Sequence, residues 1–192
     1  MQTSARRSRP WALAAIAVLA TIALVAVGAS PAAAAPIKRG HTSLIFDQNI
    51  FSGLDPLGIG MLPTAPAEAI SGGEQFPIKG GRISSDATTA RINHGGGLAF
   101  VGDNAQVKLK RLKVSLNPDG SELIASVGGQ RMSFLSLEGA RTTSRGRNIT
   151  VRGIHASFTR KAAKALNQAF ATDFFQKGMR LGKLRIELKL AR

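Results

Sequence analysis

The sequence contains no cysteine in 192 residues, and this absence excludes several kinds of protein. Without cysteine the chain cannot form the disulfides on which small exported scaffolds commonly depend, nor the thiolate ligands of many structural zinc sites. Two enzyme motifs are also missing, the G-x-S-x-G turn of serine hydrolases and the phosphate-binding G-x-x-x-x-G-K-[ST] loop. We therefore expect one domain that is stabilised by burial of apolar side chains.

Acidic residues are scarce and scattered, and no carboxylate lies at a motif spacing from a histidine. General acid–base and nucleophilic catalysis both need such groups to converge. A hydrolase would need Asp86, Asp103, Glu122 or His94 to cluster in a cleft. The sequence therefore predicts that the protein is not an enzyme.

The eleven acids are outnumbered by 26 Lys and Arg, which gives a net charge of +15 at pH 7. A charge of this size says something about partners and nothing about the fold. For an exported protein it indicates anionic cell-wall polymers or lipid headgroups. Nucleic acid is not expected, because no aromatic side chains interleave with the basic ones to stack on bases. The alternative is a basic surface that only keeps the protein soluble.

Residues 1–34 have the organisation of a secretion signal. The first ten residues contain three arginines and no acid, and residues 11–27 are apolar apart from one threonine. Small residues at 30–35 fit a cleavage site, which we place after Ala34. The alternative is an uncleaved membrane anchor at residues 11–27, a length at the lower limit for spanning. Both interpretations predict export to the cell surface or beyond.

The rest of the chain has the alternating pattern of antiparallel strands separated by turns. We expect a flexible lead-in at residues 35–41 and a single β domain at residues 42–192. The clearest strand is 106–116, whose alternation changes phase at Lys110-Arg111 as a bulge would require. Further strands are predicted at 42–46, 76–83, 89–93, 122–127, 131–137, 148–158 and 183–190, with a polar loop at 142–147.

One helix is predicted at about residues 159–171, before the last strand, with Thr159 as its N-cap. Residues 51–73 hold five glycines and three prolines, so we expect a long irregular connection there that packs across the core. The resulting fold class is mainly β, either an antiparallel β-sandwich or a partly closed barrel with this one helix.

The most informative stretch is residues 91–100, where His94 directly precedes Gly95, Gly96 and Gly97. Three consecutive glycines are kept where the backbone needs positive φ or close approach to another group. A histidine held there can donate, accept or ligate. The alternatives are a glycine-rich bend with a surface histidine, and a metal site shared with His41 and His155, which nothing in the sequence brings together.

Several strand and helix motifs follow one another in a definite order. They are F-P-I-K-G-G-R-I at 76–83, R-I-N-H-G-G-G-L at 91–98, V-K-L at 107–109, L-I-A-S-V-G-G at 123–129, I-T-V-R-G at 149–153, A-A-K-A-L-N-Q-A-F at 162–170 and F-Q-K-G-M-R-L-G at 175–182. Together they resemble the actinobacterial haem-transport-associated (HtaA) domain in its small secreted form, over residues 42–190.

The resemblance implies a β-rich surface domain that captures haem, or takes it from a haem-carrying protein, for uptake. His94 matches the family's glycine-flanked histidine, as a ligand or as a donor behind the ligand. The three glycines would then let the porphyrin approach the backbone, and Arg82 or Arg91 could pair with its propionates. Haem-binding members also use a tyrosine ligand, and this chain has no tyrosine.

The missing tyrosine leaves a second interpretation open. The chain would keep the fold as a structural or adhesive envelope domain that has lost haem ligation. His94 would then hydrogen-bond a backbone group at the glycine turn, and the basic surface would bind anionic wall polymers.

Overall fold

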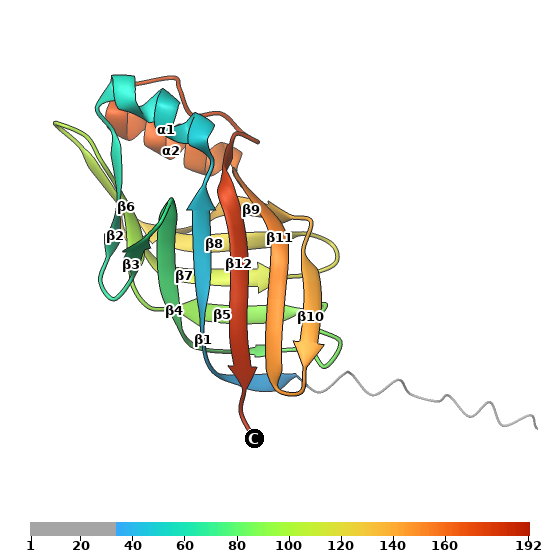
Figure 1. Ribbon diagram of the computed structural model, residues 1–192. Coiled ribbons are helices and arrows are strands. Elements are labelled where there is room, and N and C mark those ends of the chain that lie inside the picture. Colours follow the sequence, from blue (N-terminus) through green and yellow to red (C-terminus); the bar gives the residue numbers. More distant parts are fainter. Residues whose placement is uncertain (1–33) are drawn as a thin grey trace, which may run out of the picture. The chain divides into compact units, whose positions relative to one another are not determined.

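Eight of the strands close into an antiparallel barrel (Figure 1). In the computed structural model, which describes residues 34–192, they pair in the order β7, β5, β4, β1, β12, β11, β9, β8, and β8 pairs again with β7. Their bounds are β1 Ala35–Phe46, β4 Gly73–Ile83, β5 Ala90–His94, β7 Gln106–Leu116, β8 Ser121–Val127, β9 Gln130–Glu138, β11 Asn148–Phe158 and β12 Arg180–Leu190. The chain thus forms a barrel, which is one of the two predicted architectures. This barrel is fully closed, whereas the prediction was of a partly closed one.

The remaining elements attach to this barrel. Four further strands are β2 Gly60–Thr64, β3 Glu68–Ile70, β6 Gly97–Val101 and β10 Arg141–Arg145, and the helical elements are α1 Gln48–Leu54, the single 3₁₀ turn η1 Asp55–Leu57 and α2 Arg160–Phe170. The two α-helices lie at one end of the barrel, opposite the C-terminus (Figure 1). Thr159 caps α2 as predicted, because its Oγ1 accepts a hydrogen bond from the backbone N–H of Ala162 at 3.1 Å.

The barrel wall divides where β5 meets β6. Both strands run antiparallel along β7, β5 beside its second half and β6 beside its first. On the other edge β5 pairs with β4, whereas β6 pairs with β2, and β3 pairs with β4. The segment of β2 and β3 therefore lies between β6 and β4, and Gly95-Gly96 marks the point of division.

The barrel interior is filled by side chains and holds the hydrophobic core, as expected for eight strands. Phe100, Phe134, Phe158 and Phe175 are fully buried, and Phe158 lies with its ring centroid 5.6 Å from that of Phe175 and 5.9 Å from that of Phe134. The buried core residues extend from Ile37 to Leu188. The wall therefore closes around one continuous hydrophobic core.

The predicted strands are confirmed, with small shifts at their ends. The bulge predicted at Lys110-Arg111 is also present, since the register of β7 with β8 shifts between Lys110 and Lys113, and Arg111 has φ +52°. The last strand begins earlier than expected, at Arg180. These elements were predictable because one face of each is buried and the other is exposed, which imposes the period of two on the sequence.

Three expectations about irregular segments were wrong. The flexible lead-in at residues 35–41 is part of β1, whose partners β12 and β4 supply hydrogen bonds that the sequence does not reveal. The loop at residues 142–147 is strand β10. Residues 51–73 are not one irregular connection, since they contain most of α1, then η1, β2 and β3, with Leu54 and Ile59 buried in the core.

The predicted signal peptide and the alternative anchor lie almost wholly outside the described residues. Within residues 34–192, no helix has both the length and the apolar character that crossing a bilayer requires.

Candidate functional site

His94 ends β5 with its side chain directed into the barrel. Residues alternate along this strand, so Ala90, Ile92 and His94 are buried and the two residues between them are exposed. His94 is only 7% exposed, and its Nε2 lies 2.7 Å from Oγ1 of Thr42, a buried residue of β1. This hydrogen bond connects two strands that are not neighbours in the wall, because β4 lies between them.

Burial lowers the pKa of His94 to about 4, and a backbone contact with Leu112 offsets only part of that effect. The ring is therefore neutral at physiological pH. Its Nδ1 is buried and makes no hydrogen bond of ordinary geometry, although the Leu112 backbone lies close enough to influence the pKa. The imidazole is neutral, one of its nitrogens is hydrogen-bonded to Thr42, and it is almost wholly buried. These properties are more typical of a structural residue than of a ligand that an incoming group could reach.

Two of the three glycines after His94, Gly96 and Gly97, approach the protein's own backbone, whereas a Cβ on Gly95 would meet the side chains of Lys79 and Pro66. A Cβ on Gly96 would overlap the Ala67 nitrogen and the Thr64 oxygen of the turn between β2 and β3, and Gly96 has φ +76°. A Cβ on Gly97 would overlap the Leu109 oxygen of β7. Glycine is required here because the wall divides and three strands converge. Atoms of the chain itself, not open space for a porphyrin, therefore lie against Gly96 and Gly97.

Arg82 and Arg91 lie on the opposite side of the wall from His94. They are directly paired between β4 and β5, and both are exposed on the outer face. Arg82 donates hydrogen bonds to the backbone oxygen of Ala34, the shorter of 2.9 Å. The structure therefore does not bring the two arginines together with His94 around one ligand.

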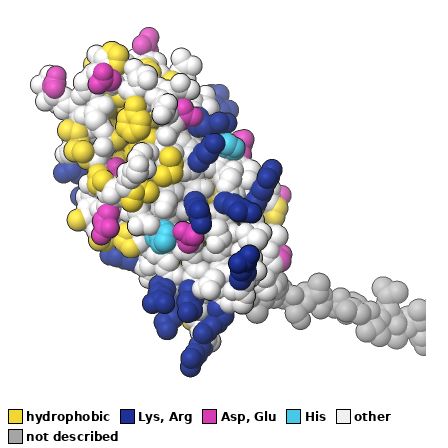
Figure 2. Space-filling view, in the orientation of Figure 1, with side chains coloured by type: hydrophobic (Ala, Val, Ile, Leu, Met, Phe, Trp, Pro, Cys, Tyr) yellow, Lys and Arg dark blue, Asp and Glu magenta, His cyan; other side chains and the backbone are white. Residues whose placement is uncertain are grey.

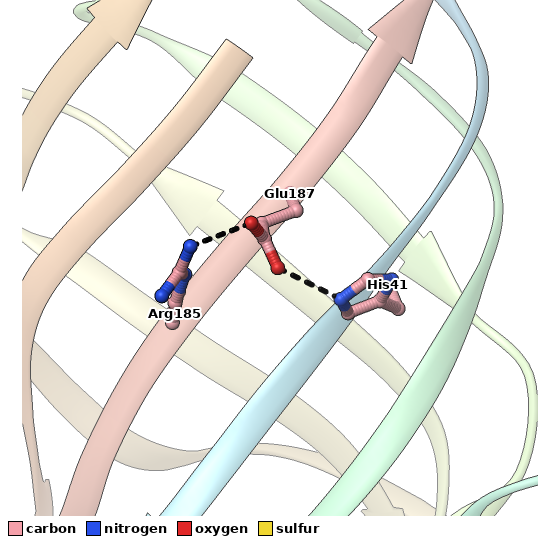
Figure 3. Close-up of polar contacts among 3 residues, drawn as sticks. All are labelled: His41, Arg185 and Glu187. Carbon is pink, nitrogen blue, oxygen red and sulfur yellow. Dashed lines mark hydrogen bonds and ion pairs between the residues drawn. The ribbon is translucent and has the colours of Figure 1, made fainter. Parts of the chain in front are cut away.

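The other two histidines lie on the outer face, apart from His94. His41 Nε2 lies 3.0 Å from Oε2 of Glu187, whose Oε1 accepts a hydrogen bond of 2.7 Å from Arg185 (Figure 3). In the strand register His155 lies opposite Glu138 of β9 and opposite Lys183 of β12. Within residues 34–192 no group of three His, Asp or Glu side chains is arranged to hold a metal ion.

The acids considered for hydrolysis do not converge either. Asp86 lies in the turn after β4 and is bonded to Ser84 and Thr88, and Asp103 lies in the turn after β6. Glu122 lies on β8, which is separated from His94 by β7.

Sequence reasoning missed a second buried titratable residue, Glu74 at the start of β4. It is 1% exposed, and neither carboxylate oxygen has a hydrogen-bond partner in the protein. Burial raises its pKa to about 8, so the carboxyl is largely protonated at neutral pH. Its only sequence signal is an acid on the inward face of the strand, where the apolar Phe76 and Ile78 follow it at steps of two residues.

Sequence reasoning also missed an exposed apolar surface beside α1. The four large hydrophobic side chains that are most exposed in the described residues are Phe51 on α1, Ile45, Leu57 and Leu62, at 43%, 42%, 40% and 54%. All four belong to the segment that leaves β1, passes through α1 and η1 and enters β2. Figure 2 shows hydrophobic side chains gathered over α1, β2 and β3. We call these four residues the apolar surface.

Comparison with solved structures identifies the fold. The C-terminal domain of HtaA from Corynebacterium glutamicum superposes with a TM-score of 0.65 at 17% identity, covering 82% of this chain and 99% of that one. The N-terminal domain of the same protein gives 0.63 at 14% identity, covering 81% and 99%. The heme binding protein HtaB from the same organism gives 0.58 at 10% identity, covering 83% and 96%.

No protein-family model matches the sequence, and a search of curated proteins gave no match. The structural likeness confirms the resemblance drawn from the ordered motifs: the domain is HtaA-like in fold.

Replacing Gly96 with alanine should destabilise the domain more than the same change at Gly129. Both glycines have positive φ, which costs alanine about 1–2 kcal/mol, but a Cβ on Gly129 meets open space. Overpacking against the turn at Thr64 and Ala67 should add about 1–3 kcal/mol at Gly96. Urea unfolding of the two variants measures the difference, and equal losses would contradict the close-approach explanation.

The free energy of unfolding between pH 4 and pH 6.5 should depend on the protonation of His94. Its pKa is about 4 in the folded domain and 6.5 as a free side chain, so the unfolded chain binds the proton more readily. Its contribution is complete above pH 6.5 and is lost as the pH falls towards 4. His94→Gln should flatten the free energy of unfolding over this range. An unchanged slope in that variant would show that His94 is not buried in its neutral form.

The free energy of unfolding between pH 4.5 and 8 should depend on Glu74, with a sign opposite to that for His94. Its folded pKa of about 8 exceeds the ordinary 4.5, so stability is greatest below pH 4.5 and falls as the pH rises to 8. Glu74→Gln should remove this decline, which is on the order of 2–4 kcal/mol. Urea unfolding between pH 4.5 and 8 measures it, and a decline that persists in the variant would assign it to other groups.

Proposed function

We propose that this chain, which has the fold of the HtaA domains, is an exported, non-enzymatic domain that binds haem on its apolar surface. The proposal rests on the structural likeness to the HtaA domains and to a heme binding protein. The superposition covers nearly the whole of each of these solved chains. An HtaA-like fold suggests a haem-related role, and the chain's own residues have to provide the site.

The apolar surface supports this proposal because exposed apolar patches on monomeric domains commonly mark binding sites. A porphyrin is a broad, flat and largely apolar molecule, and it buries both Phe51 and Leu62 more readily than a small polar ligand would. Phe51 is braced from behind by Phe46, with ring centroids 5.4 Å apart in an edge-to-face arrangement. A braced ring is ready to stack without prior rearrangement.

The residues present do not fit ligation of the haem iron by the barrel. The chain has no tyrosine, and His94 is buried, neutral and bonded to Thr42. Coordination by His94 would require the hydrogen bond to break and the divided wall at Gly95 and Gly96 to open. We therefore assign binding to apolar contact with the macrocycle, and we assign His94 a structural role.

Hemin and iron-free protoporphyrin IX should bind the domain of residues 34–192 with affinities within about threefold of each other, because no protein group contacts the iron. Phe51→Glu and Leu62→Glu should each weaken both ligands by about tenfold, since a carboxylate on the apolar surface must lose water on binding. Gln130→Glu, an equal charge change at an exposed position of β9, is the control. Absorbance and fluorescence titrations measure all of these.

Three results would overturn the proposal. Hemin that binds at least tenfold more tightly than the iron-free ring would show that a protein ligand reaches the iron. Affinities that the two surface variants leave unchanged would show that haem does not bind at the apolar surface. Absence of saturable binding of either ring would refute haem binding itself.

A further inference from the structure

Strand β10 contributes nothing to the core, although it is a regular element. All five of its residues are exposed, and it pairs with β11 alone, outside the closed path of the barrel. Its register places Arg141 opposite Arg152, and Arg145 opposite Asn148. An exposed strand that stabilises little by burial displays its side chains, and two of the five here are arginines, Arg141 and Arg145.

The arginines of β10 extend a set of cations on the outer surface of four adjacent strands. In one row Arg39 of β1 lies opposite Lys189 of β12, which lies opposite Asn148 of β11 and so beside Arg145. Neighbouring strands are about 4.8 Å apart, so Arg39 and Lys189 lie one strand apart, and Arg145 lies two strands beyond Lys189 with the neutral Asn148 between them. The outer surface of β1, β12, β11 and β10 is here called the basic face, and its cations are Arg39, Arg141, Arg145, Arg147, Arg152, Lys183, Arg185 and Lys189.

The basic face contains a shallow open groove that crosses the strands. Its lining includes Arg39, Asn148, Thr150 and Lys189, which offer cationic ends and neutral hydrogen-bonding groups together. Figure 2 shows dark blue side chains gathered over β12, β11 and β10, away from the hydrophobic side chains over α1 and β2. The groove thus has the shape and charge for an extended anionic ligand.

One carboxylate on the basic face, Glu187, would oppose an anion, but its charge is already paired. Burial alone would raise the pKa of Glu187, but hydrogen bonds from Arg185 and His41 outweigh it and lower the pKa (Figure 3). The carboxylate therefore holds Arg185 and His41 in place beside the groove, and the remaining cations carry the net positive charge.

We propose that the basic face binds a linear polymer of phosphate groups along this groove, independently of the haem surface. Arginine predominates on this face, and its planar fork matches phosphate oxygens bidentately. A flexible polymer can follow cations around a curved barrel wall, whereas a flat bilayer touches few strands at once. The face also lacks large apolar side chains among its arginines that would insert into lipid, apart from Ile45 at its edge.

The test is binding of long-chain inorganic polyphosphate to the domain of residues 34–192, with a charge-matched control. Arg145→Gln, Arg147→Gln and Lys189→Gln together remove three charges from the basic face. Lys108→Gln, Lys110→Gln and Arg111→Gln remove three from exposed positions of β7, which lies four strands from β12 in either direction around the barrel. All six positions lie outside the core, so both variants should fold.

We expect the first variant to bind polyphosphate about tenfold more weakly at low salt, and with a shallower salt dependence, because fewer counterions are released. The second should lose less than about threefold. Equal losses in the two variants would overturn the proposal, since net charge alone would then explain binding. Stronger binding to phosphatidylglycerol vesicles than to polyphosphate would also overturn it, in favour of a membrane. The haem titrations should be unaffected by either variant, which separates this proposal from the previous one.

Discussion

The close approach of backbone at Gly96 and Gly97 is the constraint on which the rest of the structure depends. At this point β5, which pairs with β4, gives way along β7 to β6, which pairs with β2, and the turn between β2 and β3 occupies the space where a side chain on Gly96 would be. The division lets a closed eight-stranded barrel carry an added segment next to α1. That segment contributes Leu62 to the apolar surface.

The same constraint explains the position of His94. The residue before the glycines is the last of β5 and faces inward, so its ring must find a polar partner inside the barrel, and Thr42 provides it. The chain tolerates buried His94 and Glu74 because each adopts its neutral form, the histidine through a lowered pKa and the carboxyl through a raised one. The interior is thus uncharged although the molecule as a whole is strongly basic.

The outer surface is divided between two chemistries. Apolar side chains are exposed where β1 passes into α1 and β2, and cations are exposed across β1, β12, β11 and β10. The two surfaces meet at Ile45 and its cross-strand partner Lys183. A ligand held on the first and a polymer held on the second would therefore lie on one side of the barrel without competing for the same residues.

The sequence by itself determined the eight strands of the barrel apart from the first residues of β1, the bulge at Lys110-Arg111, the capped helix after Thr159 and the HtaA-like order of motifs, because each is encoded in a local period or turn. It also identified His94 and its glycines as special. Only the tertiary structure decided what they do, since the inward direction of His94, the bond to Thr42 and the backbone against Gly96 come from strands far apart in the chain. Residues 35–41 and β10 were missed for the same reason: their partners, not their own patterns, make them strands.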